Sequence, residues 1–255
     1  MKKYLKNLFC CLCVLAVLAL ASCSNKDTKM PQPTVDRSFS SNASTDNDQI
    51  VGNPAIKLSA ASDPYLVLVN KTHKLPDDWE QKVEIIEVQN SLGESLKIEK
   101  KAYEAFYKLR EDLLKNDDVQ IELDSVYRSV AEQEEMVEWF KQEYGEEYAR
   151  TYAAVPGFSE HHTGLAVDIF VMGKDGVEIR ENDAMIADVE DFQKIHSKLA
   201  DYGFILRYLD GKDNITGYAY EPWHLRYINN VEKAQWIMEH NLTFEEYLNE
   251  TEGGE

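Results

Sequence analysis

The chain has 255 residues, enough for one domain of ordinary size with extensions, and its 44% hydrophobic and 11% aromatic residues are sufficient for a substantial core. Its formal net charge at pH 7 is −19. This acidity excludes the basic surface that nucleic-acid binding requires, and it argues against a broad electrostatic attachment to anionic lipids.

The first 22 residues have the organisation of a secretory signal. Three lysines among the first six residues precede an apolar run at 8–20, which is too short for a typical membrane span. Leu-Ala-Ser-Cys closes this run at 20–23, and small residues before a cysteine resemble the lipobox of bacterial lipoproteins. That resemblance implies cleavage before Cys23 and lipid attachment to its side chain. An ordinary cleaved signal and an uncleaved anchor are the alternatives.

All four cysteines lie in this N-terminal part, three within the signal and the fourth at the predicted lipid site. The mature domain therefore has neither a disulfide nor a cysteine nucleophile, although an exported protein faces an oxidising exterior. Its stability must come from packing, and any metal site must use histidine, aspartate and glutamate side chains.

Residues 23–64 are poor in large apolar side chains and rich in Ser, Asn, Asp, Thr and Pro. Such a composition cannot bury enough surface to offset the entropy of ordering the chain. We therefore expect a flexible, lipid-anchored linker that leads to one globular domain at 65–250, with an acidic tail at 251–255.

The globular region mixes predicted helices with short predicted strands. Helices are expected at 96–115, from Ser129 to about 143 with Glu132 completing a capping box, at 146–154, at 188–202 with Gly203 as C-cap, and at 231–249. Strands are expected at 66–69, at 119–126, from about 165, at 204–208 and, interrupted at Pro222, within 217–227. These elements lack regular βαβ spacing, so the predicted fold class is α+β.

The first motif that carries chemistry is Ser-Glu-His-His-Thr-Gly-Leu-Ala-Val-Asp-Ile-Phe, at residues 159–170. Its aspartate, Asp168, lies in an otherwise apolar strand, where a carboxylate is costly unless it is paired, hydrogen-bonded or bound to a metal. Two imidazoles, His161 and His162, lie just upstream. A metal site is one interpretation, and a solvated or purely structural cluster is the other.

A second motif, Glu-Pro-Trp-His-Leu-Arg, occupies residues 221–226. Side chains three residues apart on a regular strand point to opposite faces. Pro222 favours an irregular edge, however, and a turn or bulge there would bring Glu221 and His224 to one side. The alternative is a surface glutamate and a packed histidine.

Together the two motifs provide the parts of a catalytic zinc site. One histidine of the first motif, Asp168 and His224 are the three protein ligands that such a site needs beside one open position. Glu221 is then left near the metal, where a carboxylate can take a proton from water activated by zinc.

The combined pattern resembles the VanY-type zinc D-Ala-D-Ala carboxypeptidases, which include D,D- and L,D-carboxypeptidases that trim peptidoglycan stem peptides. The matching positions are Ser159-x-His161-x-x-Gly164-x-Ala166-x-Asp168, then Glu221-x-Trp223-His224-x-Arg226 and, as a third motif, Tyr127-Arg128-Ser129 with Gln133. The resemblance covers about residues 65–249. It implies a compact α+β domain in which a small antiparallel sheet carries the site.

The resemblance also implies individual roles. The ligands of one zinc ion per chain would be His161, Asp168 and His224, which leaves the second histidine of the doublet as a bystander. Glu221 would be the general base, and Arg128 would bind substrate and stabilise the oxyanion. Further substrate contacts are expected at Gln133, Ser159 and Trp223, although Gln133 could be a solvated helix residue and Ser159 could serve only to order its loop.

Three functions are compatible with the sequence. The first is a zinc carboxypeptidase that acts on muropeptides outside the cytoplasm, held at the membrane by its lipid alone. The second is a zinc-containing module that binds the cell wall without cutting it, and the third is a peptidoglycan endopeptidase or amidase. The intact Glu221 argues against the second, because a purely structural site needs no base. The sequence does not decide between the D,D and the L,D bond, nor between zinc and another divalent ion.

Overall fold

The computed structural model describes residues 63–252, and every structural statement below concerns this part of the chain. Its main sheet has five antiparallel strands in the order β3-β4-β7-β6, with β5 paired to β4, and β1 and β2 form a separate hairpin. The strands are β1 (Ile85–Gln89), β2 (Ser95–Glu99), β3 (Gln120–Ser125), β4 (Ala166–Met172), β5 (Glu178–Ile179), β6 (Phe204–Tyr208) and β7 (Glu221–Tyr227).

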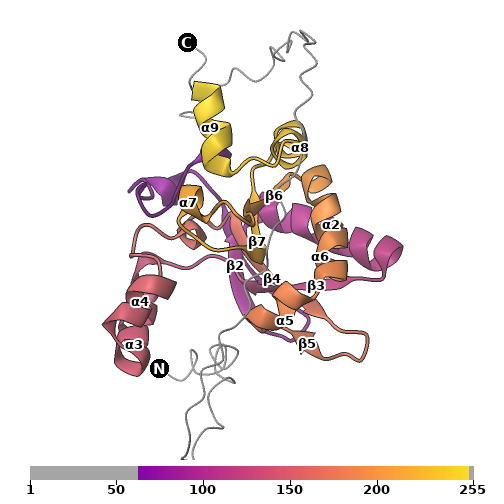
Figure 1. Ribbon diagram of the computed structural model, residues 1–255, viewed down its shortest axis with the longest axis horizontal. Helices are drawn as coiled ribbons and strands as arrows, with labels where there is room; N and C mark the ends of the chain where they lie inside the picture. Colours follow the sequence, from indigo (N-terminus) through magenta and orange to yellow (C-terminus); the bar gives the residue numbers. More distant parts are fainter. Residues whose placement is uncertain (1–62, 253–255) are drawn as a thin grey trace, which may run out of the picture. The chain divides into compact units, whose positions relative to one another are not determined.

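Helices α2 and α6 lie side by side against the main sheet, whereas α3 and α4 form a hairpin at its side (Figure 1). The α-helices are α2 (Lys100–Asp117), α3 (Val130–Tyr144), α4 (Glu146–Tyr152), α5 (Asn182–Ala187), α6 (Val189–Lys198), α7 (Asp213–Thr216), α8 (Val231–Glu239) and α9 (Phe244–Glu252). Short 3₁₀ turns are η4 (Pro64–Leu66), η5 (Trp79–Gln81), η6 (Glu160–Thr163) and η7 (Leu199–Tyr202). This arrangement confirms the α+β class and the small antiparallel sheet.

The main core lies between α2, α6 and one face of the sheet. Helix α2 begins at Lys100 because the Glu99 carboxylate accepts a hydrogen bond from the Ala102 amide at 2.8 Å. Its buried residues recur at helical spacing, and burial of each leucine or phenylalanine among them contributes on the order of 1.5–3 kcal/mol. They are Ala102, Phe106, Leu109 and Leu113.

Strand β4 separates the core from the candidate site. Leu165, Val167 and Ile169 pack into the main core and are fully buried. Because side chains alternate along a strand, Ala166 and Asp168 face the opposite side. This is the arrangement that the sequence predicted for the lone aspartate.

A second, smaller core joins the C-terminal helices to β6. It is formed mainly by α8 and α9 packing on Ile205, and its buried members are Leu66, Ile205, Ile228, Ala234, Ile237, Phe244, Tyr247 and Leu248. Helix α9 is therefore an integral part of the fold.

Two element predictions near the N-terminus of the domain were wrong. The helix expected at 96–115 begins only at Lys100, because residues 95–99 pair with β1 as strand β2, a hairpin that the sequence reading missed. The strand expected at 66–69 does not form. Leu66 ends η4, which Asp63 caps and Pro64 opens, and residues 67–69 belong to no helix or strand. In both cases a capping carboxylate decided where a helical turn begins.

The single C-terminal helix expected at 231–249 was also wrong, because two helices meet there. The Thr243 hydroxyl accepts from the Glu246 amide at 3.1 Å, and the Glu246 carboxylate accepts from the Thr243 amide at 2.8 Å. This reciprocal capping box starts α9, and Asn241, with a φ of 50°, reverses the chain just before it. The short helices α5 and α7 were not predicted.

Other predictions were confirmed. Strands β3, β4 and β6 lie where expected, Ser129 and Glu132 form the predicted capping box of α3, and Gly203 ends η7 with a φ of 74°. Strand β7 runs through Pro222 without a break, although its pairing with β6 is irregular.

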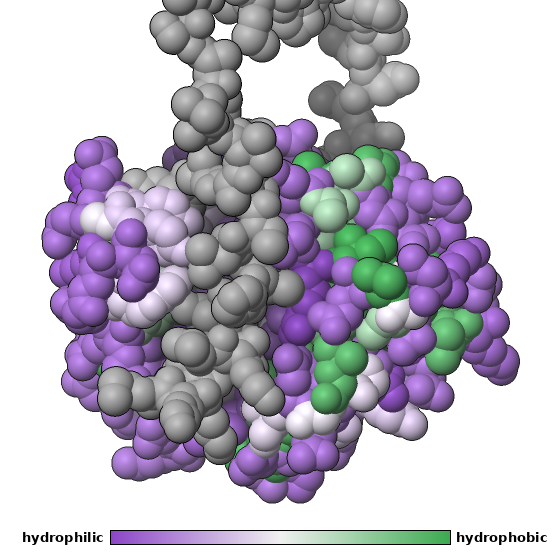
Figure 2. Space-filling model, turned by 90° about the horizontal axis from the view of Figure 1, so that it is seen from below, coloured by the Kyte–Doolittle hydropathy of each residue, from purple (hydrophilic) through white to green (hydrophobic). Residues whose placement is uncertain are grey.

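The surface seen in Figure 2 is mainly hydrophilic, with separate hydrophobic patches. Among the described residues no helix combines the length and the apolar character needed to cross a bilayer. The predicted signal at 1–22, with the lipid site Cys23, and the predicted linker up to residue 62 lie outside the described residues, so they stay predictions.

Candidate metal and catalytic site

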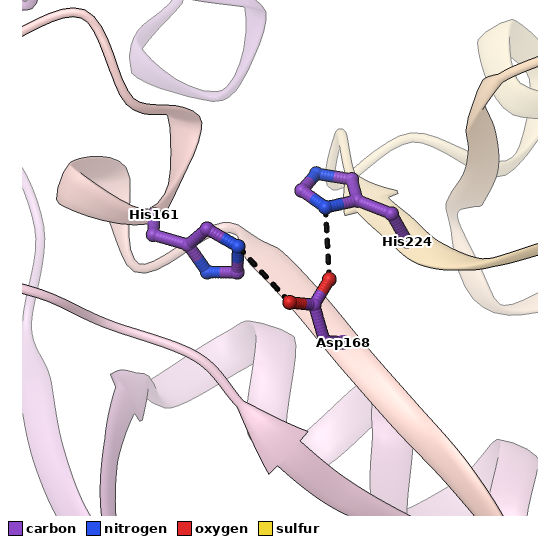
Figure 3. A group of neighbouring side chains, drawn as sticks. All are labelled: His161, Asp168 and His224. Carbon is purple, nitrogen blue, oxygen red and sulfur yellow. Dashed lines mark ion pairs between the residues drawn. The ribbon is translucent and has the colours of Figure 1, made fainter. Parts of the chain in front are cut away.

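Three side chains from distant parts of the chain converge on one point. His161 comes from η6, Asp168 from β4 and His224 from β7, and one ligand atom of each lies within 4.8 Å of the other two. Strand pairing brings the last two together, since Asp168 lies directly opposite His224. Figure 3 shows the two imidazole rings approaching different oxygens of the same carboxylate.

The geometry of this group fits a metal ion better than a set of ordinary hydrogen bonds. His161 Nε2 lies 3.2 Å from Asp168 Oδ2, and His224 Nδ1 lies 2.8 Å from Asp168 Oδ1. Within the described chain Asp168 Oδ1 is nevertheless a buried oxygen that accepts no hydrogen bond of acceptable geometry. Two nitrogens and a carboxylate are the donor set of many catalytic zinc sites, so these residues could hold the ion.

Both imidazoles have their remaining nitrogen engaged. His161 Nδ1 lies 2.7 Å from the Val126 carbonyl oxygen, which can only accept, so this nitrogen carries the proton and Nε2 is left with its lone pair. His224 Nε2 lies 3.1 Å from a carboxylate oxygen of Glu160, which leaves Nδ1 facing Asp168. Such partners fix which nitrogen is free to bind a metal.

Neighbouring rings hold the aspartate in its charged form. Burial alone would raise the pKa of Asp168, but the imidazoles of His161 and His224 lower it far below its usual range. For His224, burial would lower the pKa, whereas Asp168 and Glu160 raise it to about 10. Two carboxylates thus favour a positive charge at this position, which is either a proton on His224 Nδ1 or a bound metal ion that replaces it.

A bulge in β7 brings Glu221 to the same side as His224. Leu206 pairs with Leu225 and Tyr208 with Glu221, so two steps along β6 correspond to four steps along β7. As a result Glu221 Oε2 lies 3.7 Å from His224 Nδ1, the nitrogen that faces Asp168. The bulge predicted from the Pro-Trp sequence is confirmed.

Burial shifts the protonation of Glu221 toward neutral pH. Burial raises the pKa of its carboxyl to about 7, with the nearby charges of Asp168 and Glu160 acting in the same direction and His224 opposing them. A carboxyl group with a pKa close to the operating pH both accepts and returns a proton readily.

Arg128 is held rigidly beside this group. Its Nη1 donates to Gln133 Oε1 at 2.8 Å and its Nη2 donates to Ser125 Oγ at 3.0 Å, while its backbone amide donates to the His161 carbonyl at 3.1 Å. Ser125 pairs with Asp168 across β3 and β4. The guanidinium is thus fixed next to the strand position of the aspartate, and it stays charged because the pKa of arginine is very high.

Gln133 is buried, and it is not the solvated helix residue that was one of its two interpretations. Besides accepting from Arg128, it donates through Nε2 to the Ala154 carbonyl at 2.8 Å. It therefore connects the arginine to the segment that follows α4. Whether it also touches substrate stays a prediction.

The second histidine of the doublet is occupied elsewhere. His162 Nδ1 lies 2.6 Å from the Arg128 carbonyl, and its Nε2 accepts from the Gly157 amide at 3.0 Å. Both ring nitrogens are used, so His162 has no lone pair to offer a metal. This agrees with the expectation that His161 is the ligand.

The remaining predicted contacts are less central. Ser159 is buried at the start of η6, and Trp223 is half-buried and packs against the main core. Neither belongs to the converging group, so their substrate roles stay predictions. The other described histidines, His73, His196 and His240, also lie outside this group.

Sequence reasoning missed Glu160, which is 3% exposed and contacts His224 directly. The motif leaves the position between Ser159 and His161 unspecified, so it did not point to this residue. Burial alone would raise the pKa of its carboxyl, but Arg207 and Arg226, together with the hydrogen bond to His224, hold it well below its usual range.

Comparison with known proteins places this site in a family. The family described as VanY, D-alanyl-D-alanine carboxypeptidase, matches residues 95–230. YodJ of Bacillus subtilis, named as a carboxypeptidase, is 38% identical over 187 residues, which is 72% of this chain and 66% of YodJ. The chain spans 62–66% of the full length of the first curated relatives that it matches.

Solved structures of carboxypeptidases are also similar to this chain. The LD-carboxypeptidase LdcB is 35% identical with a TM-score of 0.60, and the match covers 72% of this chain and 86% of LdcB. A mutant of the vancomycin resistance D,D-pentapeptidase VanY, solved in complex with Zn(II), is 32% identical with a TM-score of 0.58. The match covers 73% of this chain and 100% of that chain.

Proposed function

Because this chain belongs to the VanY family of D-alanyl-D-alanine carboxypeptidases, we propose that it is a zinc-dependent carboxypeptidase that releases the C-terminal D-alanine from peptidoglycan stem peptides. The observation that carries the proposal is the convergence of His161, Asp168 and His224 with Glu221 on the same side of β7. A site that only stabilised the fold would not need a carboxyl group with a pKa near neutrality beside its ligands.

In this proposal three side chains bind the metal ion and a fourth transfers the proton. His161 Nε2, His224 Nδ1 and Asp168 would hold one zinc ion, which supplies a Lewis acid that polarises the scissile carbonyl and makes water easier to deprotonate. Glu221 accepts the proton from the attacking water and passes it to the amine of the departing D-alanine.

Arg128 supplies the electrostatic part of the mechanism. Ser125 and Gln133 hold its guanidinium in one orientation, so no reorganisation is needed when negative charge develops on the carbonyl oxygen. The same charge suits the carboxylate at the end of the peptide.

The relatives' names support this substrate class. LdcB is described as an LD-carboxypeptidase that recognises peptidoglycan, and a relative from Enterococcus gallinarum is named as a bifunctional D-Ala-D-Ala dipeptidase and carboxypeptidase. We propose the same extracytoplasmic substrate for this chain.

Product analysis tests the proposal. The purified full-length chain, loaded with zinc, is incubated with muropeptides that carry pentapeptide or tetrapeptide stems, and the products are identified by mass spectrometry. Loss of one alanine, abolished by a chelator and restored by zinc, is the expected result. Loss from the pentapeptide indicates a D,D bond and loss from the tetrapeptide an L,D bond.

Other outcomes of this experiment contradict the proposal. Binding of muropeptides without any product would favour a cell-wall-binding module. Cleavage within crosslinked dimers, without loss of a terminal alanine, would favour an endopeptidase.

We propose further that the chain is a lipoprotein attached through Cys23, on the basis of the sequence pattern at residues 20–23. Incorporation of labelled fatty acid into the wild-type chain, and its loss in Cys23→Ser, would support this. Equal labelling of both would refute it.

A further inference from the structure

Glu160 is a fully buried carboxylate that contacts three cationic or proton-donating groups. Its Oε1 accepts from Arg207 Nε at 2.8 Å and from Arg226 Nη1 at 2.7 Å, and its Oε2 lies 3.1 Å from His224 Nε2. The two oxygens therefore have separate partners. Oε1 accepts from both arginines, and Oε2 contacts the histidine of the candidate metal site.

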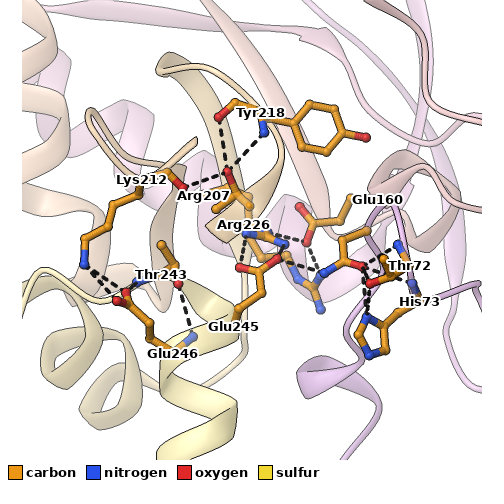
Figure 4. Close-up of polar contacts among 12 residues, drawn as sticks. Thr72, His73, Glu160, Arg207, Lys212, Tyr218, Arg226, Thr243, Glu245 and Glu246 are labelled. Carbon is orange, nitrogen blue, oxygen red and sulfur yellow. Dashed lines mark hydrogen bonds and ion pairs between the residues drawn. The ribbon is translucent and has the colours of Figure 1, made fainter. Parts of the chain in front are cut away.

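The surrounding cluster pairs two arginines with two glutamates, and α9 contributes the second glutamate, Glu245. Arg207 donates to both carboxylate oxygens of Glu245, at 2.7 and 2.9 Å, and Asn70 donates to Glu245 at 3.0 Å. The remaining guanidinium nitrogens of Arg226 donate to main-chain carbonyl groups. Two arginines thus face two glutamates in a buried network, with Glu245 projecting from α9 toward Arg207 (Figure 4).

This arrangement dictates where the proton of His224 resides. A carboxylate that accepts from two guanidinium groups is ionised and has no proton to donate, so His224 Nε2 must be the donor in their contact. When a metal ion takes the place of the proton on Nδ1, the imidazole is neutral and its single N–H is the one at Nε2. The lone pair is then on Nδ1, the atom 2.8 Å from Asp168 Oδ1. The Tyr208 ring, whose centroid lies 4.7 Å from that of His224, packs beside the imidazole.

We propose that Glu160 is a positioning residue, which fixes His224 as the Nε2–H tautomer so that Nδ1 faces the metal. Glu160 is itself held by Arg207 of β6, which Glu245 of the C-terminal helix α9 holds in turn. This inference rests on the proposed function only for the presence of a metal ion. Partners of metal-binding histidines typically change metal affinity by 10- to 100-fold when they are removed.

Glu160→Gln provides the sharpest test, because it keeps the side-chain volume and reverses the hydrogen-bond polarity toward His224. The amide oxygen will face the two arginines, which can only donate, and the amide NH₂ group will then donate to His224 Nε2. That contact moves the imidazole proton to Nδ1, so zinc affinity should fall at least tenfold.

Glu245→Gln is the matched control. It removes one carboxylate from the same buried cluster and from the same arginine. Among the described residues, however, the hydrogen bonds of Glu245 go to Arg207 and Asn70 and not to His224. Both variants should lose thermal stability, and only Glu160→Gln should lose zinc affinity. Affinity is measured on the full-length chain by competition with a zinc-binding dye, in the absence of peptide.

A second measurement needs no variant of the cluster. Long-range ¹H–¹⁵N spectra of the zinc-loaded wild-type chain, labelled with ¹⁵N-histidine and assigned with His224→Gln, report which nitrogen of His224 is protonated. Protonated Nε2 supports the proposal. Protonated Nδ1, or equal zinc affinity in the Glu160 and Glu245 variants, overturns it.

The two proposals can fail separately. A chain that binds zinc through the expected tautomer and releases no alanine would refute the proposed function alone. A chain that releases alanine, with Glu160→Gln binding zinc as tightly as Glu245→Gln does, would refute only the role of Glu160.

Discussion

Replacement of Glu221 by glutamine separates proton transfer from metal binding. The two side chains have nearly the same shape, so the bulge in β7 and the three converging ligands should be preserved. Zinc affinity should therefore stay close to that of the wild type. Thermal stability should not fall, because burial already disfavours the ionised form of Glu221.

The expected loss of rate follows from the role of the carboxylate. A positioned general base contributes about 10²- to 10⁴-fold, which corresponds to about 2.7–5.4 kcal/mol in the activation free energy. An amide cannot accept the proton, so this contribution disappears from kcat. The Michaelis constant should change little, since Arg128 and the metal ligands remain in place.

The pH dependence has a defined sign. Glu221 must be ionised to act as a base, and its pKa is raised to about 7, so kcat/KM should fall as the pH decreases through this value. A zinc ion nearby favours the ionised form and lowers the midpoint, which should therefore lie at or below pH 7. The residual activity of Glu221→Gln should lack this acidic limb.

The assay is the release of D-alanine from a defined muropeptide by the zinc-loaded full-length chain, measured from pH 5 to pH 9. Wild type and variant are compared at matched zinc occupancy. A variant that keeps on the order of a tenth or more of the wild-type kcat, or that keeps the same acidic limb, would show that Glu221 is not the base.

Three further changes follow from the geometry. His162→Ala should leave zinc affinity nearly unchanged in a competition titration, because both ring nitrogens already have protein partners; a loss as large as that caused by removing His161 would refute the assignment. Gly164→Ala should lower the melting temperature by several degrees, since φ is +70° and an added Cβ would lie 2.6 Å from Ile85 Cδ1; an unchanged melting curve would contradict this. Arg128→Lys keeps the charge but loses the fork held by two side chains, so kcat/KM should fall on the order of 100- to 1000-fold, and near-normal activity would argue against oxyanion stabilisation.

Local context marked Asp168, one histidine of the doublet and His224 as candidate ligands, whereas the choice of His161 over His162 came from the family resemblance. A carboxylate inside an apolar strand is costly without a partner, and strand pairing places Asp168 opposite His224. The bulge that aligns Glu221 was also predictable, because proline interferes with regular pairing.

The environment of Glu160 could not be predicted in this way. Its arginine partners lie 47 and 66 residues further along the chain. Arg226 belongs to the second motif, but nothing in the sequence pairs it or Arg207 with Glu160. Only the packing of η6, β6 and β7 against one another buries all three side chains. A buried ion network is a property of the tertiary structure, and a single sequence carries no signal for it.

The element errors have a different cause. Leu96 and Ile98 alternate within β2, but they also fit the helical spacing of the apolar residues that follow, so the start of α2 was misplaced. The break before α9 had a readable signal, since Thr-Phe-Glu-Glu at 243–246 is a capping-box sequence, and it was overlooked within a longer amphipathic pattern.

The bulge in β7 also determines where this protein can change during evolution or in engineering. Glu221 and His224 are joined by a two-residue segment, so an insertion or deletion between them would separate the base from its ligand. Asp168 is held opposite His224 by the pairing of β4 with β7 instead. The interval at 173–220 connects these two paired strands. Loops in that interval can be lengthened, shortened or exchanged to alter substrate selectivity while the chemistry of the site is inherited unchanged.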